Sequence, residues 1–374
     1  MLCEAPGVHD VKTPQKTSST NFKSKQLHTT IMPIVKHNRY FDAFVKDELP
    51  SSVAGKVFVI TGTTSGSGFV AARTVLLKGG EVVALNRKSS RVESATARLL
   101  QGKDDGEPPP PGKLVNVECD LQDFASVRSA IGEIKTKYTR IYCLVHNAGI
   151  GIDDKGEVTV DGYNKIAQTN SLSQFLLTAE LFPLLVKQAA TAASDDIVEA
   201  PRIVNMSSGA KDMVGKRGID EKLFSKLGEE EKNIGGSEMN RYAQTKLANV
   251  LFIHALHEKL RQSKNMDAQK ILAISANPGA MGKDMTEEFG WLLRQMFYLF
   301  IRMTGQSNED GAMGLLVGMM SPKAKSGVLY GPKNAGMSGP AVPNEPPKKH
   351  DHDAKSMEML WKVSEEAVGF KFDM

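Results

Sequence analysis

Residues 56–68 of the chain read Lys-Val-Phe-Val-Ile-Thr-Gly-Thr-Thr-Ser-Gly-Ser-Gly. The first five are mostly apolar and rich in β-branched residues, which is typical of a short buried strand. The remaining eight contain three glycines, and residues 70–78 then carry apolar side chains at helical intervals. The stretch therefore predicts a strand, a glycine-rich turn and a helix in direct succession.

The predicted turn has the chemistry of a pyrophosphate cradle. Glycine allows positive φ and close approach of a ligand, and the helix after it attracts an anion through its free N–H groups and dipole. The spacing is GxxxGxG rather than the GxGxxG of the common dinucleotide-binding turn. Such a turn taken alone is as often an ordinary loop, but its place between a strand and a helix favours dinucleotide binding. The predicted contacts are Gly62, Thr64, Ser65, Gly66, Ser67 and Gly68.

The rest of the chain alternates short apolar segments with helical patterns. This alternation predicts an α/β fold, a doubly wound, mostly parallel sheet of about seven strands with helices on both faces. Polar or Pro-rich segments are interpreted as loops at 102–112, 191–200 and 211–236, and as a linker at 338–352 before a last helix at 354–368. Further strands are expected at 81–85, 114–119, 141–145, 202–206, 271–276 and 326–330, and helices at 91–100, 125–138, 163–189, 239–262 and 310–320.

Residues 46–370 are expected to form this single domain, because their number is within the range of one α/β domain. Residues 1–45 are interpreted as a mostly disordered arm, since residues 1–31 are rich in Ser, Thr and Lys and lack the apolar core of a secretory signal. Organelle targeting by residues 1–31 stays an alternative. No run of about 18 apolar residues occurs, so no membrane-spanning helix is expected.

The composition argues against several classes of protein. Lys and Arg number 47 against 43 Asp and Glu, and no basic stripe with interleaved aromatics occurs, so nucleic-acid binding is not expected. The three cysteines lack CxxC spacing and the eight histidines lack HExxH spacing, which predicts neither a metal site nor a disulfide framework. A reducing, cytoplasmic setting is the simplest interpretation.

The end of the second predicted strand indicates which dinucleotide fits. An acidic residue there would bind the ribose 2′-hydroxyl of NAD and repel the 2′-phosphate of NADP. This chain has Asn86, Arg87 and Lys88 instead. Two cations without a carboxylate favour a phosphate, so the predicted cofactor is NADP(H). The alternative is that both cations are simply solvated.

Tyr242 and Lys246 stand four residues apart within the predicted helix 239–262, and therefore on the same helix face. A nearby ammonium stabilises phenolate and lowers a tyrosine pKa from its usual value of about 10. Such a tyrosine can exchange a proton with a substrate oxygen. The alternative is an ordinary surface pair, since YxxxK also occurs by chance.

Three other polar features lie where the predicted fold would bring them toward this helix. Ser208 closes the fifth strand and Asn147-Ala148-Gly149 follow the fourth, at the edge where parallel strands present a ligand crevice. The alternatives are a helix cap and a common turn. Asn170 lies inside predicted helix 163–189, where a poor helix former indicates a local reason such as a bound water or a bulge.

Taken together and in this order, these motifs resemble the short-chain dehydrogenase/reductase family over residues 55–369. Residues 242–252, 309–312, 327–330 and 360–365 are similar to its retinol-dehydrogenase-like branch, which also contains protochlorophyllide-reductase-like members. The resemblance rests on the glycine turn, Cys119-Asp120-Leu121, Asn147-Ala148-Gly149, Asn170, Ser208, Tyr242, Lys246 and Asn277-Pro278-Gly279.

The resemblance implies a role for each matching residue. Tyr242 would be the general acid/base, and Lys246 would lower its pKa and hold the nicotinamide ribose. Ser208 would orient the substrate oxygen, and Asn170 would hold a water behind Lys246. Around the cofactor, Asp120 and Leu121 would flank the adenine, Asn147, Ala148 and Gly149 would form the floor, and Pro278 and Gly279 the nicotinamide side. The departures from the family pattern are Ser67, Asn86, Met281 and Lys283.

Residues 280–305 are interpreted as an apolar substrate lid, because residues 291–303 are rich in Leu, Phe and Met. This favours a lipophilic carbonyl or alcohol as substrate, and also peripheral contact with a membrane. Core packing or a homodimer interface is the alternative. The predicted function is NADP(H)-dependent hydride transfer. The competing functions are reduction of a carbon–carbon double bond in a pigment-like molecule and a non-catalytic NADP(H)-binding regulator.

Overall fold

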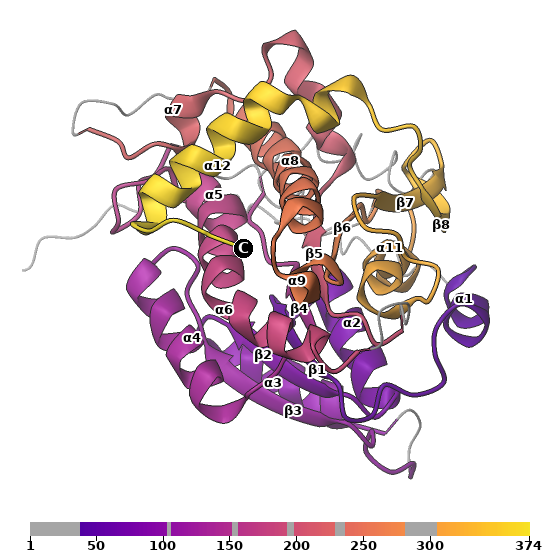
Figure 1. The fold of residues 1–374 in the computed structure, drawn as a ribbon. Coiled ribbons are helices and arrows are strands. Elements are labelled where there is room, and N and C mark those ends of the chain that lie inside the picture. Colours follow the sequence, from indigo (N-terminus) through magenta and orange to yellow (C-terminus); the bar gives the residue numbers. More distant parts are fainter. Residues whose placement is uncertain (1–37, 103–105, 152–155, 193–197, 229–235, 281–304) are drawn as a thin grey trace, which may run out of the picture. The chain divides into compact units, whose positions relative to one another are not determined.

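The computed structural model describes residues 38–102, 106–151, 156–192, 198–228, 236–280 and 305–374 (Figure 1). Most of the predicted arm lies outside these residues. So does almost all of the predicted lid, with its apolar stretch 291–303 and with Met281 and Lys283. The predictions made for those segments, including membrane contact and a dimer interface, stay predictions.

One eight-stranded sheet organises the described residues, with strand order β3-β2-β1-β4-β5-β6-β7-β8 (Figure 1). The first seven strands in this order are parallel, and β8 runs antiparallel to β7. The predicted doubly wound fold is confirmed. The strands are β1 (Val57–Thr61), β2 (Glu81–Asn86), β3 (Lys113–Glu118), β4 (Cys143–His146), β5 (Arg202–Met206), β6 (Leu272–Ala276), β7 (Leu329–Asn334) and β8 (Ser338–Pro343).

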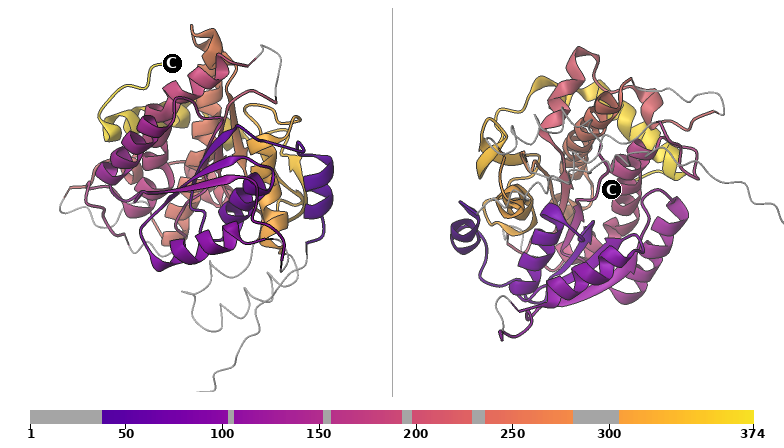
Figure 2. Two further views of the ribbon diagram at one scale, coloured as in Figure 1. Left: turned by 90° about the horizontal axis from the view of Figure 1, so that it is seen from below. Right: turned by 180° about the vertical axis from the view of Figure 1, so that it is seen from behind.

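Helices cover both faces of the sheet (Figure 2). Successive strand residues point to opposite faces, so Val59 packs into one apolar cluster with α4, α6, α8 and α12, and Ile60 into another with α2 and α11. Among the described residues, no helix is both long enough and apolar enough to span a bilayer. The long helices are α2 (Gly66–Leu77), α3 (Ser90–Leu100), α4 (Phe124–Lys137), α6 (Ser173–Ala189), α8 (Glu238–Gln262), α11 (Asn308–Met320) and α12 (Ala354–Val368).

The segment predicted as a linker, 338–352, is instead structured. It contains edge strand β8 and the short 3₁₀ helix η3 (Lys349–His352). Its prolines concealed the strand, because proline lacks a backbone donor and is tolerated only at a sheet edge. The predicted loop 211–236 likewise contains most of the 3₁₀ helix η2 (Gly209–Arg217) and the single turn α7 (Glu221–Phe224).

Predicted helix 163–189 is broken into three pieces around Asn170. A short α5 (Lys165–Ala167) leads into the π-helical turn η1 (Gln168–Leu172), which continues as α6. Asn170 lies within the π turn, so the bulge predicted from a poor helix former is present. Single π turns are often found at functional sites.

The last residues of the predicted arm belong to the folded part of the chain. The backbone N–H groups of Arg39, Tyr40 and Phe41 donate to the carboxylate of Asp310 at 2.9, 3.1 and 3.0 Å, and α1 (Phe41–Asp47) follows. Asp310 is buried in the first turn of α11 and needs such donors. The expected boundary at residue 45 is therefore too late in the chain.

Candidate active site

The glycine turn between β1 and α2 has little spare space. Gly62 has a φ of 72°, and a Cβ at Gly68 would come within 2.1 Å of the Gly62 carbonyl oxygen. The Asn147 amide donates to that same oxygen at 2.9 Å, and Ser67 Oγ donates to Asn147 Oδ1 at 2.8 Å. The turn is thus fastened to the end of β4, as a rigid binding loop requires.

A cavity of about 430 Å³ opens beside this turn. We call it the glycine-turn cavity. Two of the predicted residues, Gly68 and Lys88, do not line it. Gly68 instead packs beneath the turn. Sequence reasoning missed Leu85, Ser89, Arg91, Cys119, Gln122, Ile150 and Thr169, which also line it. The predicted residues that line it are Gly62, Thr64, Ser65, Gly66, Ser67, Asn86, Arg87, Asp120, Leu121, Asn147, Ala148 and Gly149.

One corner of the glycine-turn cavity is basic. Arg87 and Arg91 line it, and Arg91 also lines an adjoining hollow with Arg98. No carboxylate of the described residues lines that hollow. Asn86 instead supports the turn, because its Oδ1 accepts from the Thr63 N–H at 2.9 Å. Arg91 could have been found from the sequence, because it is a second arginine only four residues after Arg87.

Ser208 and Tyr242 meet across two elements. Ser208 follows β5 and caps η2, where its Oγ accepts from the Ala210 N–H at 3.2 Å, so the predicted alternative of a cap also holds. Tyr242 lies in the first turns of α8 and lines the same cavity as Ser208, whose hydroxyl can donate a hydrogen bond to the phenolate form of the tyrosine. Burial raises the pKa of Tyr242, whereas the bond from Ser208 lowers it.

Lys246 lies one helical turn after Tyr242 and is buried. Its Nζ is 5.7 Å from the centroid of the Tyr242 ring and donates to the Met206 carbonyl at 3.2 Å. Burial lowers the pKa of Lys246 to about 8. The sequence predicts that the ammonium lowers the pKa of Tyr242, but that pKa is raised in the structure because desolvation by burial is the largest effect.

Two residues that sequence reasoning missed hold α8 against the end of β5. Ser207 Oγ donates to the Lys246 carbonyl at 2.7 Å, and Asn249 Nδ2 donates to the Met206 carbonyl at 2.9 Å. Neither stands out by pattern. Ser207 is the neighbour of a predicted residue, and Asn249 is an ordinary polar position three residues after Lys246.

Asn170 joins this group to the glycine-turn cavity. Its Oδ1 accepts from the Ile150 N–H at 2.8 Å, and its Nδ2 donates to the Ile150 carbonyl at 3.0 Å and to Thr245 Oγ1 at 3.1 Å. A Cβ added at Gly149 would lie 3.1 Å from Asn170 Oδ1 and 3.3 Å from Lys246 Nζ. Lys246 therefore stands next to the floor of the glycine-turn cavity.

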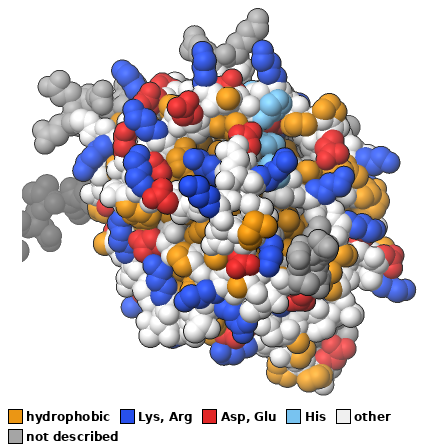
Figure 3. All heavy atoms as spheres, in the orientation of Figure 1, with side chains coloured by type: hydrophobic (Ala, Val, Ile, Leu, Met, Phe, Trp, Pro, Cys, Tyr) orange, Lys and Arg blue, Asp and Glu red, His pale blue; other side chains and the backbone are white. Residues whose placement is uncertain are grey.

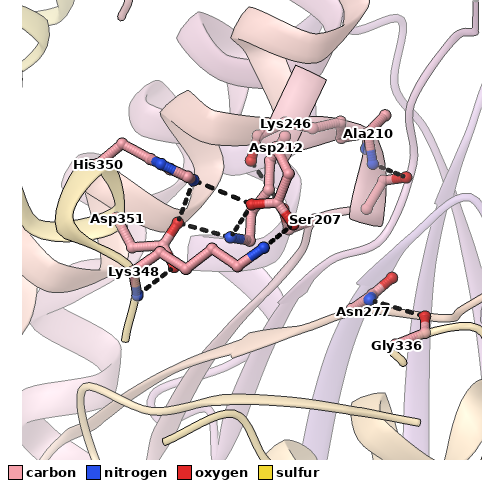
Figure 4. Close-up of polar contacts among 11 residues, drawn as sticks. Ser207, Ala210, Asp212, Lys246, Asn277, Gly336, Lys348, His350 and Asp351 are labelled. Atoms are coloured by element: carbon pink, nitrogen blue, oxygen red, sulfur yellow. Dashed lines mark hydrogen bonds and ion pairs between the residues drawn. The ribbon is translucent and has the colours of Figure 1, made fainter. Parts of the chain in front are cut away.

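On the other side, Ser208 and Tyr242 line a second cavity of about 770 Å³, which we call the tyrosine cavity. Gly279 lines it, whereas Pro278 is fixed through its carbonyl, which accepts from Gln306 Nε2 at 2.9 Å. Asn277 donates to the Gly336 carbonyl at 3.3 Å (Figure 4). The apolar part of the lining comprises Ala210, Met213, Met239, Ala280, Leu329, Pro332, Ala335, Met337, Val342 and Pro343.

A charged cluster also borders the tyrosine cavity. Asp212, His350 and Asp351 are close enough to share a cation. Lys211 Nζ and Lys348 Nζ already lie 2.9 and 2.6 Å from the Asp212 carboxylate, however, so ammonium groups supply the positive charge. We assign no metal to this cluster.

Ser208, Tyr242 and Lys246 lie at the edge of a doubly wound sheet, between the glycine-turn cavity and the tyrosine cavity. This arrangement is typical of nicotinamide-dependent oxidoreductases. Residues 56–219 match the family described as short chain dehydrogenase. These residues belong to the short-chain dehydrogenase/reductase family of oxidoreductases, as the sequence had indicated.

Known proteins show the same relationship over much of the chain. A short-chain dehydrogenase/reductase of Emericella nidulans, pkfC, is 27% identical over 270 residues, which are 72% of this chain and 80% of that protein. A crystal structure of a protein from Mycobacterium paratuberculosis has a TM-score of 0.63 and 25% identity, covering 88% of this chain and 98% of the other. The RhlG/NADP active-site complex of Pseudomonas aeruginosa has a TM-score of 0.52 and 21% identity, covering 75% and 95%, and shares the fold.

Proposed function

We propose that the protein is an NADP(H)-dependent oxidoreductase that transfers hydride between the nicotinamide and a lipophilic carbonyl or alcohol carbon. The observation that carries the proposal is the position of Lys246. It stands between the floor of the glycine-turn cavity at Gly149 and the ring of Tyr242, which lines the tyrosine cavity together with Ser208. A cofactor in one cavity and a substrate in the other would meet at this lysine.

The glycine turn fits a pyrophosphate. Gly66 lines the cavity with a φ of 58°, and a Cβ there would meet no heavy atom within 4 Å, so the backbone is open to a ligand on that side. Gly66 also begins α2, whose N-terminal N–H groups favour an anion. The bound dinucleotide would supply the hydride in the reductive direction and accept it in the oxidative direction.

The chain's own groups supply proton transfer and positioning. In the reductive direction Tyr242 donates its phenolic proton to the oxygen of the substrate, and in the oxidative direction it takes that proton back. Ser208 donates a hydrogen bond that stabilises phenolate, as its effect on the pKa of Tyr242 indicates. Lys246 places a cation beside the same ring, with its amine held by the Met206 carbonyl.

Family membership leaves NAD(H) and NADP(H) open, so the preference for NADP(H) rests on charge. Arg87 and Arg91 line the glycine-turn cavity, and Arg98 lies in the hollow that adjoins it. Guanidinium groups bind phosphate through charge-assisted hydrogen bonds. This corner supports recognition of a 2′-phosphate.

The apolar side chains of the tyrosine cavity support a lipophilic substrate, and we keep the retinol-dehydrogenase-like branch as part of the proposal. The test is a panel of aldehydes, ketones and alcohols, from small sugars to long-chain and polycyclic compounds, followed by NADPH and NADH absorbance. We expect lipophilic compounds to turn over fastest and with NADP(H). Faster turnover of small sugars would contradict the substrate class, and no turnover with any compound would contradict the enzyme assignment.

A further inference from the structure

The position of Ser208 depends on a short and weak element. Ser208 caps η2, and the Lys211 N–H donates back to the Ser208 carbonyl at 3.1 Å. Helices of the 3₁₀ type have poor hydrogen-bond geometry, and this one is broken at Gly215, with φ 69° and ψ −152°. Side chains must therefore decide where its first turn lies.

Lys211 provides such an anchor. Its side chain is only 3% exposed, and its Nζ lies 2.6 Å from Asp351 Oδ1 of η3 and 2.9 Å from Asp212 Oδ1. Lys348 joins the same two segments in the other direction, because its Nζ lies 2.6 Å from Asp212 Oδ2 and its N–H donates to Asp351 Oδ2. His350 Nε2 adds a contact of 2.9 Å to Asp212.

Burial makes the Lys211–Asp351 contact the dominant one of this network. Exposed ion pairs contribute little, but Asp351 is 2% exposed, and removing one partner of a buried pair leaves an uncompensated charge. The network also faces α8 through His254, near His257 and His352. Burial lowers the pKa of His254 to about 4, so it is neutral near pH 7.

We propose that Asp351, acting through Lys211, is a positioning residue that holds the first turn of η2 so that the Ser208 hydroxyl reaches the Tyr242 phenol. Lys211, Asp212 and Lys348 also line the tyrosine cavity. The clamp, as we call the ion pairs that join these three residues and Asp351, therefore forms part of the cavity wall. The inference rests on the proposed function, since it gives Ser208 and Tyr242 their roles.

The first test is Asp351→Asn in the full chain. We expect kcat to fall about tenfold with an unchanged KM for NADPH, because misplacement by less than an ångström is costly at a reacting centre. We also expect the basic limb of the kcat–pH profile to move to higher pH, since the bond from Ser208 lowers the pKa of Tyr242. Asp353→Asn is the matched control: that side chain is the exposed N-cap of α12, a place where asparagine serves as well.

The second test is the same substitution in a Ser208→Ala background. A residue that acts through Ser208 should then have no further effect on kcat. If Asp351→Asn does not fold, the pair Lys211→Met and Asp351→Leu replaces both charges with apolar side chains, which folds generally tolerate, and the same comparison applies.

The outcomes separate the two proposals. An equal loss of kcat in both backgrounds, or an unmoved pH profile, would overturn the positioning role. If Tyr242→Phe abolishes turnover while Asp351→Asn leaves kcat and its pH profile unchanged, only this inference fails. If Tyr242→Phe is fully active, the proposed function itself fails.

Discussion

The glycine-turn cavity and the tyrosine cavity lie at the same carboxyl edge of the sheet, but different kinds of segment line them. The first is lined mainly by residues of four short segments within 62–67, 85–91, 119–122 and 147–150, which lie at or just after the ends of β1 to β4, and by Thr169 of η1. The second is lined by the segments that follow β5 and β6, by the start of α8, by residues of β7 and β8, and by Lys348. Among the described residues, the two cavities share none of their lining.

The difference has a physical cause. Backbone amides and glycines bind a constant ligand part, such as a pyrophosphate, and local sequence suffices to place them. A substrate cavity needs particular side chains from distant segments, and these are held by pairs such as Lys211 with Asp351, 140 residues apart. The charges on the face drawn in Figure 3 are of both signs and interspersed.

Tyr242→Phe should best separate the function of the tyrosine cavity from that of the glycine-turn cavity. We expect kcat to fall by about 10²- to 10⁴-fold because the proton donor is lost, while NADPH binding is retained because residue 242 does not line the glycine-turn cavity. Stopped-flow turnover and NADPH fluorescence titration measure the two effects. Tyr163→Phe, a buried tyrosine packed on Phe124, is the control and should remain active. Loss of NADPH affinity in the first variant would show that the cavities are not independent.

Ser208→Ala should give the next largest effect, a loss of about 10²-fold in kcat, comparable to removing one donor from an oxyanion site. The bond from Ser208 lowers the pKa of Tyr242, so its removal should raise that pKa and shift the basic limb of the kcat–pH profile upward. Ser208→Thr keeps the hydroxyl and should retain the profile. A downward shift would mean that the serine acts on another group.

Gly68→Ala should disturb the glycine-turn cavity instead. The added methyl would lie 2.1 Å from the Gly62 carbonyl oxygen and 2.2 Å from Asn147 Nδ2, so the turn must move. We expect NADPH affinity to fall roughly tenfold or more and stability to drop by about 1–3 kcal/mol, measured by titration and thermal unfolding. Gly132→Ala in α4 meets no atom within 4 Å and should be neutral or slightly stabilising. Unaltered NADPH binding in Gly68→Ala would contradict the cradle.

The smallest expected change is in cofactor choice. Arg87→Asp should lower the ratio of kcat/KM for NADPH over NADH by about tenfold, the value of one charge-assisted hydrogen bond to phosphate. Arg140→Asp, an exposed arginine that does not line the glycine-turn cavity, should leave the ratio unchanged. A preference for NADPH that survives Arg87→Asp would remove the basis for the cofactor assignment.

The strands could be predicted because buried parallel strands are short apolar runs, and the sequence shows seven of them. Strand β8 could not, because Gly339, Pro340 and Pro343 remove the usual signal and an edge strand needs no apolar run. The three-part helix around Asn170 was only half predictable. Its poor helix propensity marked a defect, but the π turn depends on packing against α8.

The site could be predicted as far as motif order extends. Gly62, Asn147, Ser208 and Tyr242 all meet a cavity or one another as expected. The direction of the Tyr242 pKa shift could not be predicted, since it depends on desolvation, which a sequence does not record. The clamp at Asp351 was equally hidden, because a charged residue in a Pro-rich segment has the pattern of a solvated linker.

The buried carboxylate of Asp310 has a consequence for how the chain tolerates trimming at its start. Its hydrogen-bond donors are main-chain amides of residues 39–41, so many side-chain changes there would leave the contacts intact. Removal of the segment would strand a buried anion at a cost of a few kcal/mol. A maturation protease cutting before residue 38 would spare this anchor, whereas one cutting after residue 41 would release a protein that unfolds more readily.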